Sequence, residues 1–262
     1  MSTPMVRVRD LEVTFGSVRV LHGMSMDVER GETVGVVGES GSGKSTLAKV
    51  LVGMVQPSAG DVVVGGTDVG RLGRRRRDTF PYRRRVQLIP QDPYSSLSPR
   101  RTVGQTLAEA ADPLRADVAG NLPAIHRWLE RVGLEADMAS RFPHEFSGGQ
   151  RQRIAIARCL ITSPELVIAD EITSALDVSV QAQILDLLAD IRSELHLTMV
   201  FISHNLAVVQ RVSDHVVVMN HGHVVEAGTV EQVYGGPRHP YTRRLLDADP
   251  GAPGFSLQTV KP

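Results

Sequence analysis

The stretch Gly38-Glu39-Ser40-Gly41-Ser42-Gly43-Lys44-Ser45 comes directly after the apolar run Val34 to Val37. Its Gly-x-x-x-x-Gly-Lys-Ser spacing is that of a P-loop, in which backbone N–H groups surround a phosphate. Glycine suits such a loop because a Cβ obstructs both the close approach and the unusual backbone angles. We therefore expect a buried strand, the loop, and a helix from Lys44 to about Met54 whose N-terminal dipole faces the anion.

The chemistry of this loop predicts a nucleoside triphosphate as its ligand. Lys44 reaches the β- and γ-phosphates, and the Ser45 hydroxyl binds Mg²⁺. A flexible Gly/Ser linker is the alternative, but a linker does not need a strand, a loop and a helix in register. The residues expected to hold the nucleotide here are Gly38, Ser40, Gly41, Ser42, Gly43, Lys44, Ser45 and Thr46.

Composition limits the classes of function. The chain has 262 residues, 42% of them apolar, which is enough for one large α/β domain or one domain with a subdomain. Lys plus Arg and Asp plus Glu are equal at 29 each, so we expect no nucleic-acid partner. The one cysteine, Cys159, excludes an internal disulfide and a four-cysteine zinc site. We expect no secretory signal, and no apolar run approaches the roughly 20 residues of a membrane span, so a membrane role needs a partner.

The pattern along the chain predicts an interrupted α/β domain. Residues 6–37 are expected to be rich in strands, and Asp61 to Val64 and Val86 to Ile89 to form further short strands. An arginine-rich stretch from Arg71 to Arg85 interrupts the sheet. From about Thr102 to Leu160 the spacing is helical, with breaks expected at Pro113, Pro123 and Pro143, which indicates an inserted helical subdomain.

The second half of the chain returns to alternating strands and helices. A continuous apolar strand is expected at Leu166 to Ala169, a helix from about Ser179 to His196 and a buried strand at Thr198 to Ile202. Val216 to Met219 and Val224 to Glu226 are expected to pair as a hairpin. From Gly235 onward the chain is rich in Pro and Gly and is expected to be extended or partly mobile.

Two further motifs carry chemistry. Asp170-Glu171 ends an apolar strand and supplies one carboxylate for Mg²⁺ and a second to orient an attacking water, which predicts hydrolysis; the alternative is a solvated acidic turn. Phe146-Ser147-Gly148-Gly149-Gln150 opens a helix from Gln150 to Leu160 and forms a second phosphate-sized nest. Because two such sites would lie far apart in a compact monomer, we expect two chains arranged head to tail, each completing the other's site.

Together these motifs resemble those of the nucleotide-binding subunit of an ABC transporter, over nearly the whole chain. By this resemblance, Gln91 touches Mg²⁺ and the water, Glu171 is the general base, and His204 contacts the γ-phosphate. The correspondences are Phe15 with the adenine-stacking aromatic, Gly38 to Ser45 with Walker A, Gln91 with the Q-loop, Phe146 to Gln150 with the signature, Leu166 to Glu171 with Walker B, Ser174 to Asp177 with the D-loop, and His204 with the switch histidine.

The resemblance also implies a fold, ligands and partners. It implies an α/β P-loop NTPase (RecA-like) core with an N-terminal antiparallel β-subdomain and an inserted helical subdomain. The ATPase domain would cover 1–235, with the helical subdomain at about 92–162 and a tail at 236–262. ATP and Mg²⁺ would bind with Ser45, Gln91 and Asp170 at the metal, and Ser147, Gly148, Gly149 and Gln150 at the γ-phosphate of the opposite subunit. The implied partners are a second ATP-binding subunit, the same or a related chain, two transmembrane permease subunits and, indirectly, an extracellular solute-binding protein, at the cytoplasmic side of the cell membrane.

Two positions depart from the family pattern. Phe146 stands where Leu is commonest in the signature, and Ile172 stands where Pro usually follows the catalytic Glu. Replacing Pro relaxes the turn after Glu171 and adds a backbone N–H, so we expect a less firmly aimed carboxylate and somewhat slower hydrolysis.

A narrower resemblance concerns the transported solute. Asp92 to Arg100, after the Q-loop, and His239-Pro240-Tyr241-Thr242 are similar to segments of the oligopeptide, dipeptide and nickel importer subfamily. A Pro-rich tail is the alternative reading of the second segment. Peptides are the expected cargo. The alternative cargo is nickel or another small solute. The alternative function is that of a soluble ABC-type ATPase acting on nucleic acid or ribosomes.

Four other features are interpreted as structural. The eight arginines between Arg71 and Arg85 favour a solvated face over a nucleic-acid site, since only 4% of residues are aromatic. His221 and His223 favour a surface turn over a metal site. Cys159 and Trp128 are expected to pack in the interior.

Overall fold

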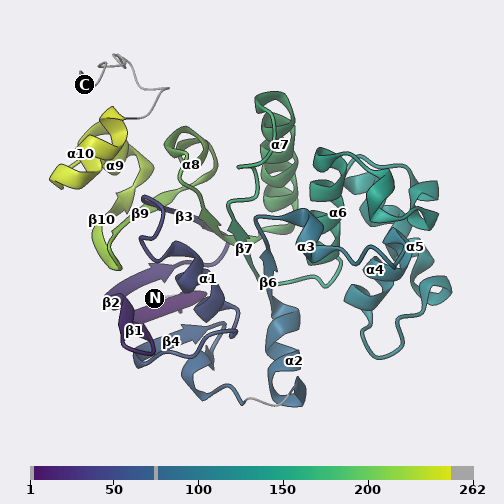
Figure 1. The fold of residues 1–262 in the computed structure, drawn as a ribbon, viewed down its shortest axis with the longest axis horizontal. Helices are drawn as coiled ribbons and strands as arrows, with labels where there is room; N and C mark the ends of the chain where they lie inside the picture. The colour runs from purple at the N-terminus through teal and green to yellow at the C-terminus, as the bar shows by residue number, and fades with distance from the viewer. Residues whose placement is uncertain (1–2, 74–75, 249–262) are drawn as a thin grey trace.

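A six-stranded sheet lies at the centre of the fold (Figure 1). The structure, a computed structural model, describes residues 3–73 and 76–248. Along the order β10-β9-β3-β8-β7-β6, all neighbours pair in parallel except β10 and β9, which form the predicted hairpin. The strands are β3 (Thr33–Val37), β6 (Val86–Ile89), β7 (Leu166–Asp170), β8 (Thr198–Ile202), β9 (His215–Asn220) and β10 (His223–Thr229).

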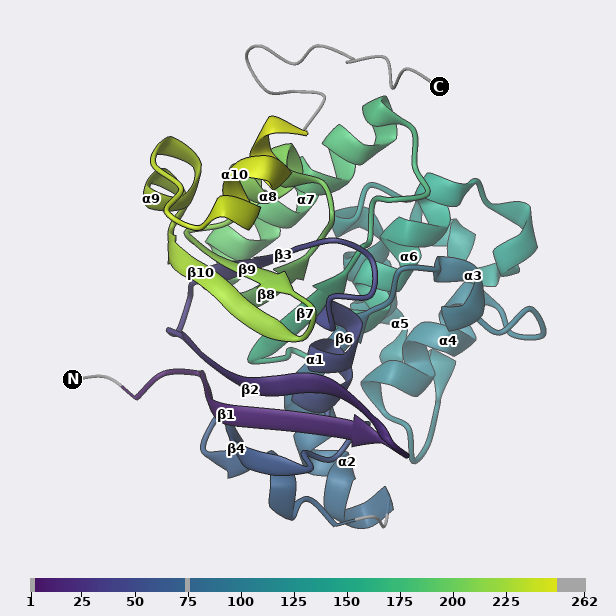
Figure 2. The same cartoon turned by 60° about the vertical axis from the view of Figure 1, so that its left-hand side comes forward.

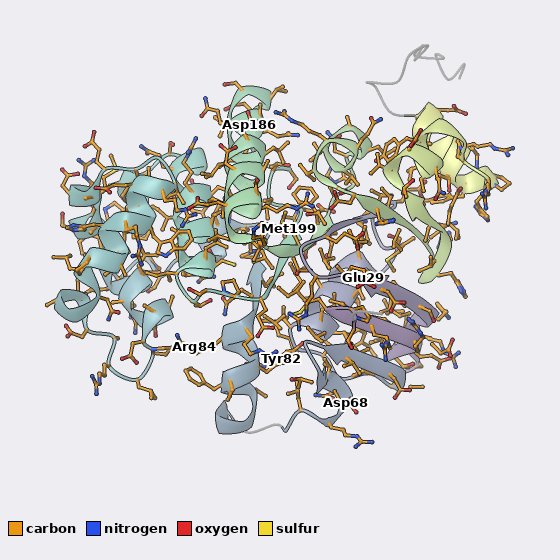
Figure 3. All side chains as sticks on the ribbon, turned by 180° about the vertical axis from the view of Figure 1, so that it is seen from behind. Glu29, Asp68, Tyr82, Arg84, Asp186 and Met199 are labelled. Atoms are coloured by element: carbon orange, nitrogen blue, oxygen red, sulfur yellow. The ribbon has the colours of Figure 1, made fainter. Side chains whose placement is uncertain are left out.

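The parallel strands are covered on both faces. Their side chains alternate between two hydrophobic cores, as the period of a strand requires. On β8, Met199 and Phe201 lie in one core, whereas Val200 and Ile202 lie in the other. Met199 is accordingly seen at the middle of the molecule in Figure 3. This double burial explains why these strands read as continuous apolar runs in the sequence.

A second, antiparallel sheet covers one face (Figure 2). Helix α1 (Lys44–Leu51) lies between the two sheets, and its Leu47 and Leu51 are fully buried with Leu11 of the antiparallel sheet. The strand-rich N-terminal part expected from the sequence is thus confirmed. Its order is β2-β1-β4-β5, with β1 (Val6–Phe15), β2 (Val18–Val28), β4 (Ala59–Val64) and β5 (Thr67–Asp68).

Helices cover the other face and extend to one side of the molecule (Figure 1). Those against the sheet are α6 (Gly148–Leu160), α7 (Val178–Leu195) and α8 (Leu206–Val212). Beyond α6 lie α3 (Pro93–Ser96), α4 (Val103–Ala111), α5 (Val118–Arg131) and the short 3₁₀ turns η2 (Ala136–Ser140) and η3 (Pro143–Glu145). Trp128 of α5 is 6% exposed, with the Arg131 guanidinium 5.0 Å from its ring centroid. The predicted packing role of Trp128 is confirmed, whereas the subdomain bounds at about 92 and 162 stay a prediction.

Helix α2 (Arg76–Arg85) joins the two sides, after the 3₁₀ turn η1 (Val69–Arg71). Tyr82 is buried in the core shared with the antiparallel sheet, whereas Arg84 points to the opposite side of the helix (Figure 3). Arg85 pairs with Glu165, and Arg83 donates to the Gly53 carbonyl at 3.2 Å. Part of the arginine-rich stretch therefore fastens α2 to its surroundings.

The expected extended tail is wrong for Pro240–Asp247, which form helix α10 after α9 (Val230–Gly235). Proline lacks the N–H that the first turn of a helix leaves unpaired, so Pro240 starts α10 instead of breaking it. His239 caps this helix by accepting from the Tyr241 N–H at 3.2 Å. Positions 249–262 of the predicted tail lie outside the described residues.

The expected break at Pro123 is also wrong. Pro123 lies inside α5, in its second turn. There the ring costs the hydrogen bond to the carbonyl four residues earlier, and the packing of Ile125 and Leu129, both fully buried, outweighs that cost.

Within 3–73 and 76–248, no helix is both long and apolar enough to cross a bilayer.

Cys159 provides a test of the packing around α6. It is 2% exposed, and burial raises the pKa of its thiol to about 12. Because the thiolate is the reactive form, we expect no reaction with Ellman's reagent at pH 8 in the native protein and one equivalent after unfolding in guanidinium. Rapid labelling of the native chain would contradict this packing.

Candidate nucleotide site

The register of the parallel sheet places the predicted motifs along one edge. Ile89 of β6 pairs with Ala169 of β7, and Asp170 pairs with Ile202 of β8, which also pairs with Val36 of β3. The carboxyl ends of these strands therefore meet. The P-loop, Gln91, the Asp170-Glu171 pair and His204 each follow one of these ends, although they are distant in the sequence.

The P-loop has the backbone that its glycines predict. Gly38 has φ 151° and Gly43 has φ 101°. A Cβ on Gly38 would lie 2.1 Å from the Met219 carbonyl oxygen, so a side chain there has no room. Lys44 is 4% exposed and donates through Nζ to the carbonyls of Gly38 at 2.7 Å and Glu39 at 2.8 Å. The loop is thus closed around its own lysine.

A pocket opens over this loop and extends to the carboxylate motif. It brings Gln91 and Glu171 beside the P-loop residues, as expected, and Val20 of β2 forms part of its wall. The P-loop residues that line it are Ser40, Gly41, Gly43, Lys44, Ser45 and Thr46. Gly38 and Ser42 belong to the loop but do not line the pocket, and Ser42 is 3% exposed. One concave site therefore joins phosphate-binding and carboxylate groups.

The donors beside Lys44 fit Mg²⁺. Ser45 donates through Oγ to Asp170 Oδ1 at 3.3 Å, so a hydroxyl and a carboxylate oxygen lie together. Hard oxygen donors of this kind, few in number, suit an ion that takes its other ligands from phosphates and water. Burial raises the pKa of Asp170 and lowers that of Lys44. A bound dication would favour the charged carboxylate of Asp170, and a bound triphosphate would favour the charged ammonium of Lys44.

Two side chains contact the Glu171 carboxylate. Gln91 donates through Nε2 to Glu171 Oε2 at 3.1 Å, and His204 Nδ1 lies 3.4 Å from the same oxygen. The Gln91 amide also reaches Ser174 Oγ at 3.4 Å. The carboxylate predicted to aim the water is therefore in contact with both the Q-loop glutamine and the switch histidine.

The turn after Glu171 is tight despite the absence of proline. Glu171 has φ 48°, a conformation that costs a non-glycine residue about 1 to 3 kcal/mol. Its N–H donates to the Ile202 carbonyl at 2.9 Å, and Ile172 is 2% exposed in the core. The buried isoleucine anchors this turn by packing. The slower hydrolysis expected from Ile172 stays a prediction.

The signature residues lie outside the lining of this pocket. Ser147 caps α6: its Oγ accepts from the Gln150 N–H at 3.3 Å, and its own N–H donates to Gln150 Oε1 at 2.9 Å. The Gln150 side chain is thus engaged in the cap. A Cβ on Gly149 would lie 2.5 Å from Val180 Cγ1, which requires glycine where α6 meets α7. The P-loop and the signature segment are therefore separate features of one chain, and their binding of anions stays a prediction.

Three further observations concern the sequence predictions. Phe15 ends β1, is 49% exposed and lies outside the pocket lining, so its adenine contact stays a prediction.

His223 stacks on His22, with ring centroids 4.7 Å apart. Within 3–73 and 76–248, no group of three or more His, Cys, Asp or Glu could hold a metal. Sequence reasoning missed Val20, which is one of many apolar strand residues and carries no motif.

Comparison with known proteins identifies a family. The family model described as ABC transporter matches residues 21–174. A Brucella ovis protein named for peptide import and ATP binding is 46% identical over 253 residues, which are 95% of this chain and 79% of that protein. The oligopeptide transport ATP-binding protein OppF of Bacillus subtilis is 42% identical, over 95% of this chain and 84% of its own.

Solved structures with the same fold extend the comparison. CbiO1 of Clostridium perfringens, part of an ABC transporter complex, has a TM-score of 0.80 and 27% identity, and the match covers 90% of this chain and 92% of that one. A dimeric ATP-binding cassette in a post-hydrolysis state with ADP and Pi has a TM-score of 0.74 and 26% identity, over 86% and 99%. These neighbours confirm the predicted P-loop fold.

The position of Glu171 predicts the effect of removing its charge. Glu171→Gln keeps the size of the side chain and removes the base, so we expect ATP to bind while turnover falls by about 10² to 10⁴-fold. Steady-state phosphate release and equilibrium binding of ATP would measure the two quantities. Near-normal turnover would remove Glu171 from this role.

Proposed function

The chain belongs to the ATP-binding proteins of ABC transporters, and we propose that it is the peripheral ATPase that powers import of di- or oligopeptides across the cell membrane. One observation carries the mechanism: the P-loop, Gln91 and Glu171 line one pocket. The peptide cargo is supported by the names of relatives at 46% and 42% identity. Isolating the chain with its permease and solute-binding partners, and identifying the solute that the binding protein holds, would test the cargo.

In the proposed mechanism, the motifs divide phosphate binding, water activation and metal binding among them. Lys44 leaves its loop carbonyls to bind the β- and γ-phosphates, and the P-loop N–H groups and the α1 dipole hold the anion. Glu171, oriented by Gln91 and His204, takes a proton from the attacking water. Ser45 and Asp170, with Gln91, would hold Mg²⁺, which neutralises charge on the phosphates when it is bound.

We propose that two chains, or this chain and a related one, form the working unit. The signature nest of Ser147 to Gln150 lies outside the P-loop pocket of its own chain, which supports use by a second subunit. The dimeric cassette among the structural neighbours supports the same arrangement. Closure would place the γ-phosphate between Lys44 of one subunit and Ser147 of the other, and exclude bulk water. Hydrolysis would remove this link and let the dimer reopen.

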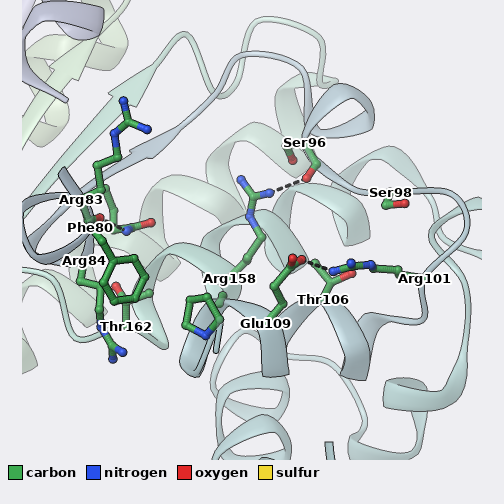
Figure 4. Close-up of a pocket in the computed structure, with 13 residues that line it drawn as sticks. Phe80, Arg83, Arg84, Ser96, Ser98, Arg101, Thr106, Glu109, Arg158 and Thr162 are labelled. Atoms are coloured by element: carbon green, nitrogen blue, oxygen red, sulfur yellow. Dashed lines mark hydrogen bonds and ion pairs between the residues drawn. The ribbon is translucent and has the colours of Figure 1, made fainter. Parts of the chain in front are cut away.

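A groove beside α3 is the proposed docking surface for a cytoplasmic helix of the permease (Figure 4). It lies between α2 and the helices that follow Gln91. Ser96 and Ser98 belong to the segment after Gln91, and Arg158 of α6 donates to the Ser96 carbonyl. A helix seated here would touch the same segment that carries Gln91. Its movement would be transmitted to Glu171 through the 3.1 Å contact of Gln91.

The charge of this groove favours an acidic segment. Four arginines line it, against one carboxylate, Glu109, which pairs with Arg101. The other three are Arg83, Arg84 and Arg158. Burial partly desolvates the Arg158 guanidinium and so lowers its pKa. An acidic side chain on the docked helix would offset that cost.

The shared site can be tested by placing two lesions on the same chain or on different chains. Ser147→Asp keeps the N-cap of α6 and adds a charge that repels the γ-phosphate, whereas Lys44→Ala disables a P-loop. With one lesion on each chain of a mixed dimer, one composite site stays intact, so we expect measurable single-turnover hydrolysis. With both lesions on one chain, neither site is intact, and hydrolysis should be lost. The reverse pattern would show that each chain uses its own signature.

The docking groove predicts a charge-reversal effect. We expect Arg84→Glu to weaken co-purification with the permease subunits by repelling the acidic segment, without changing the ATP affinity of the isolated chain. Arg7→Glu, at an exposed position of β1, is the matched control and should leave both quantities unchanged. Normal assembly of the Arg84 variant would argue against this groove.

A further inference from the structure

The C-terminal helix reaches back to the P-loop. Tyr241 of α10 is 5% exposed, and its hydroxyl accepts a hydrogen bond from the Glu39 N–H at 3.1 Å. The two residues are 202 positions apart in the sequence. Glu39 is the second residue of the P-loop, so the contact joins the His239–Thr242 motif directly to the phosphate-binding backbone.

Glu39 is held from two sides. Its carbonyl accepts from Lys44 Nζ at 2.8 Å, while its N–H donates to Tyr241. Displacement of Glu39 would therefore disturb the same carbonyl that orients the Lys44 side chain. Gly38, just before it, packs against the end of β9, where a Cβ would lie 2.1 Å from the Met219 carbonyl oxygen. The start of the loop is fixed on β9 and α10 together.

Tyr241 is itself firmly placed. The Glu226 carboxylate of β10 accepts from the Arg238 N–H at 2.8 Å and from the His239 N–H at 3.0 Å. His239 then caps α10 through the Tyr241 N–H, and Thr242 is 1% exposed. These bonds tie the first turn of α10 to the central sheet. The tyrosine hydroxyl is therefore presented to the P-loop by a rigid support.

We propose that Tyr241 is a positioning residue whose hydroxyl holds the P-loop at Glu39, so that the His239–Thr242 motif sets the nucleotide affinity of the site. The proposal rests on the proposed P-loop site. A loop already ordered before binding pays less conformational entropy when the phosphates arrive. Losing one neutral hydrogen bond of this kind corresponds to about a 2- to 10-fold loss of affinity.

The test is Tyr241→Phe in the full chain, because it removes the hydroxyl and keeps the buried ring. Tyr234→Phe is the matched control: the Tyr234 hydroxyl donates to the Leu206 carbonyl at 2.7 Å, so this variant also removes one tyrosine hydroxyl from the C-terminal region. For each variant, three quantities are measured: the Kd of a non-hydrolysable ATP analogue with Mg²⁺, the hydrogen exchange of the Glu39 amide without nucleotide, and the thermal midpoint.

We expect Tyr241→Phe to raise the Kd by about 2- to 10-fold and to speed exchange of the Glu39 amide, while Tyr234→Phe changes neither. Unchanged Kd and exchange in Tyr241→Phe would overturn the proposal. An equal rise of Kd in Tyr234→Phe would overturn it as well, because it would show a general loss of stability.

Lys44→Ala, measured in parallel, distinguishes a failure of the P-loop assignment from a failure of the role proposed for Tyr241. If it weakens binding and Tyr241→Phe does not, the P-loop site stands and the role of Tyr241 fails. If Lys44→Ala leaves the affinity unchanged, the P-loop assignment fails, and the role of Tyr241 fails with it.

Discussion

Parallel pairing of β3 with β8, and of β6 with β7 and β7 with β8, is the constraint on which the site depends. It brings four strand ends to one edge, and each end is followed by one chemical group. The pairing is fixed because both faces of these strands are buried. A slip by one residue would exchange the side chains of the two cores, including those of Val36 and Val37. Burial of apolar side chains thus determines where Lys44 and Glu171 meet.

The same geometry gives the proposed docking groove a short connection to Glu171. Gln91 has its amide on Glu171 and Ser174, while its own segment continues into α3 and the groove. One short loop, which contains Gln91, therefore connects the groove beside α3 with the Glu171 carboxylate. Gly149 adds a second rigid link, since its lack of a side chain lets α6 pack closely on α7, which starts at the D-loop. The helix that begins at the signature thus packs on the helix that follows the D-loop, and Gln91 contacts the D-loop residue Ser174.

Much of the fold and most of the pocket could be predicted because they depend on local signals. The Gly38–Ser45 spacing, the apolar run before Asp170 and the β9–β10 turn each specify their own structure. Both errors involve proline: a break was expected at Pro123, and the Pro- and Gly-rich segment from Gly235 was expected to be extended, whereas Pro123 lies within α5 and Pro240 begins α10. The contact of Tyr241 with Glu39 could not be predicted, because it depends on how β10, Glu226 and α10 fold back onto β9. Val20 likewise lines the pocket only through the packing of the two sheets.

Trp128 gives the helical side of the molecule an optical signal of its own. It is the single tryptophan of the chain, it is nearly buried in α5, and a guanidinium lies against its ring. Selective excitation of indole fluorescence therefore reports on α4 to α6 and not on the two sheets. Unfolding followed by this emission, compared with far-ultraviolet dichroism of the whole chain, would reveal whether the helical part melts as a separate cooperative unit.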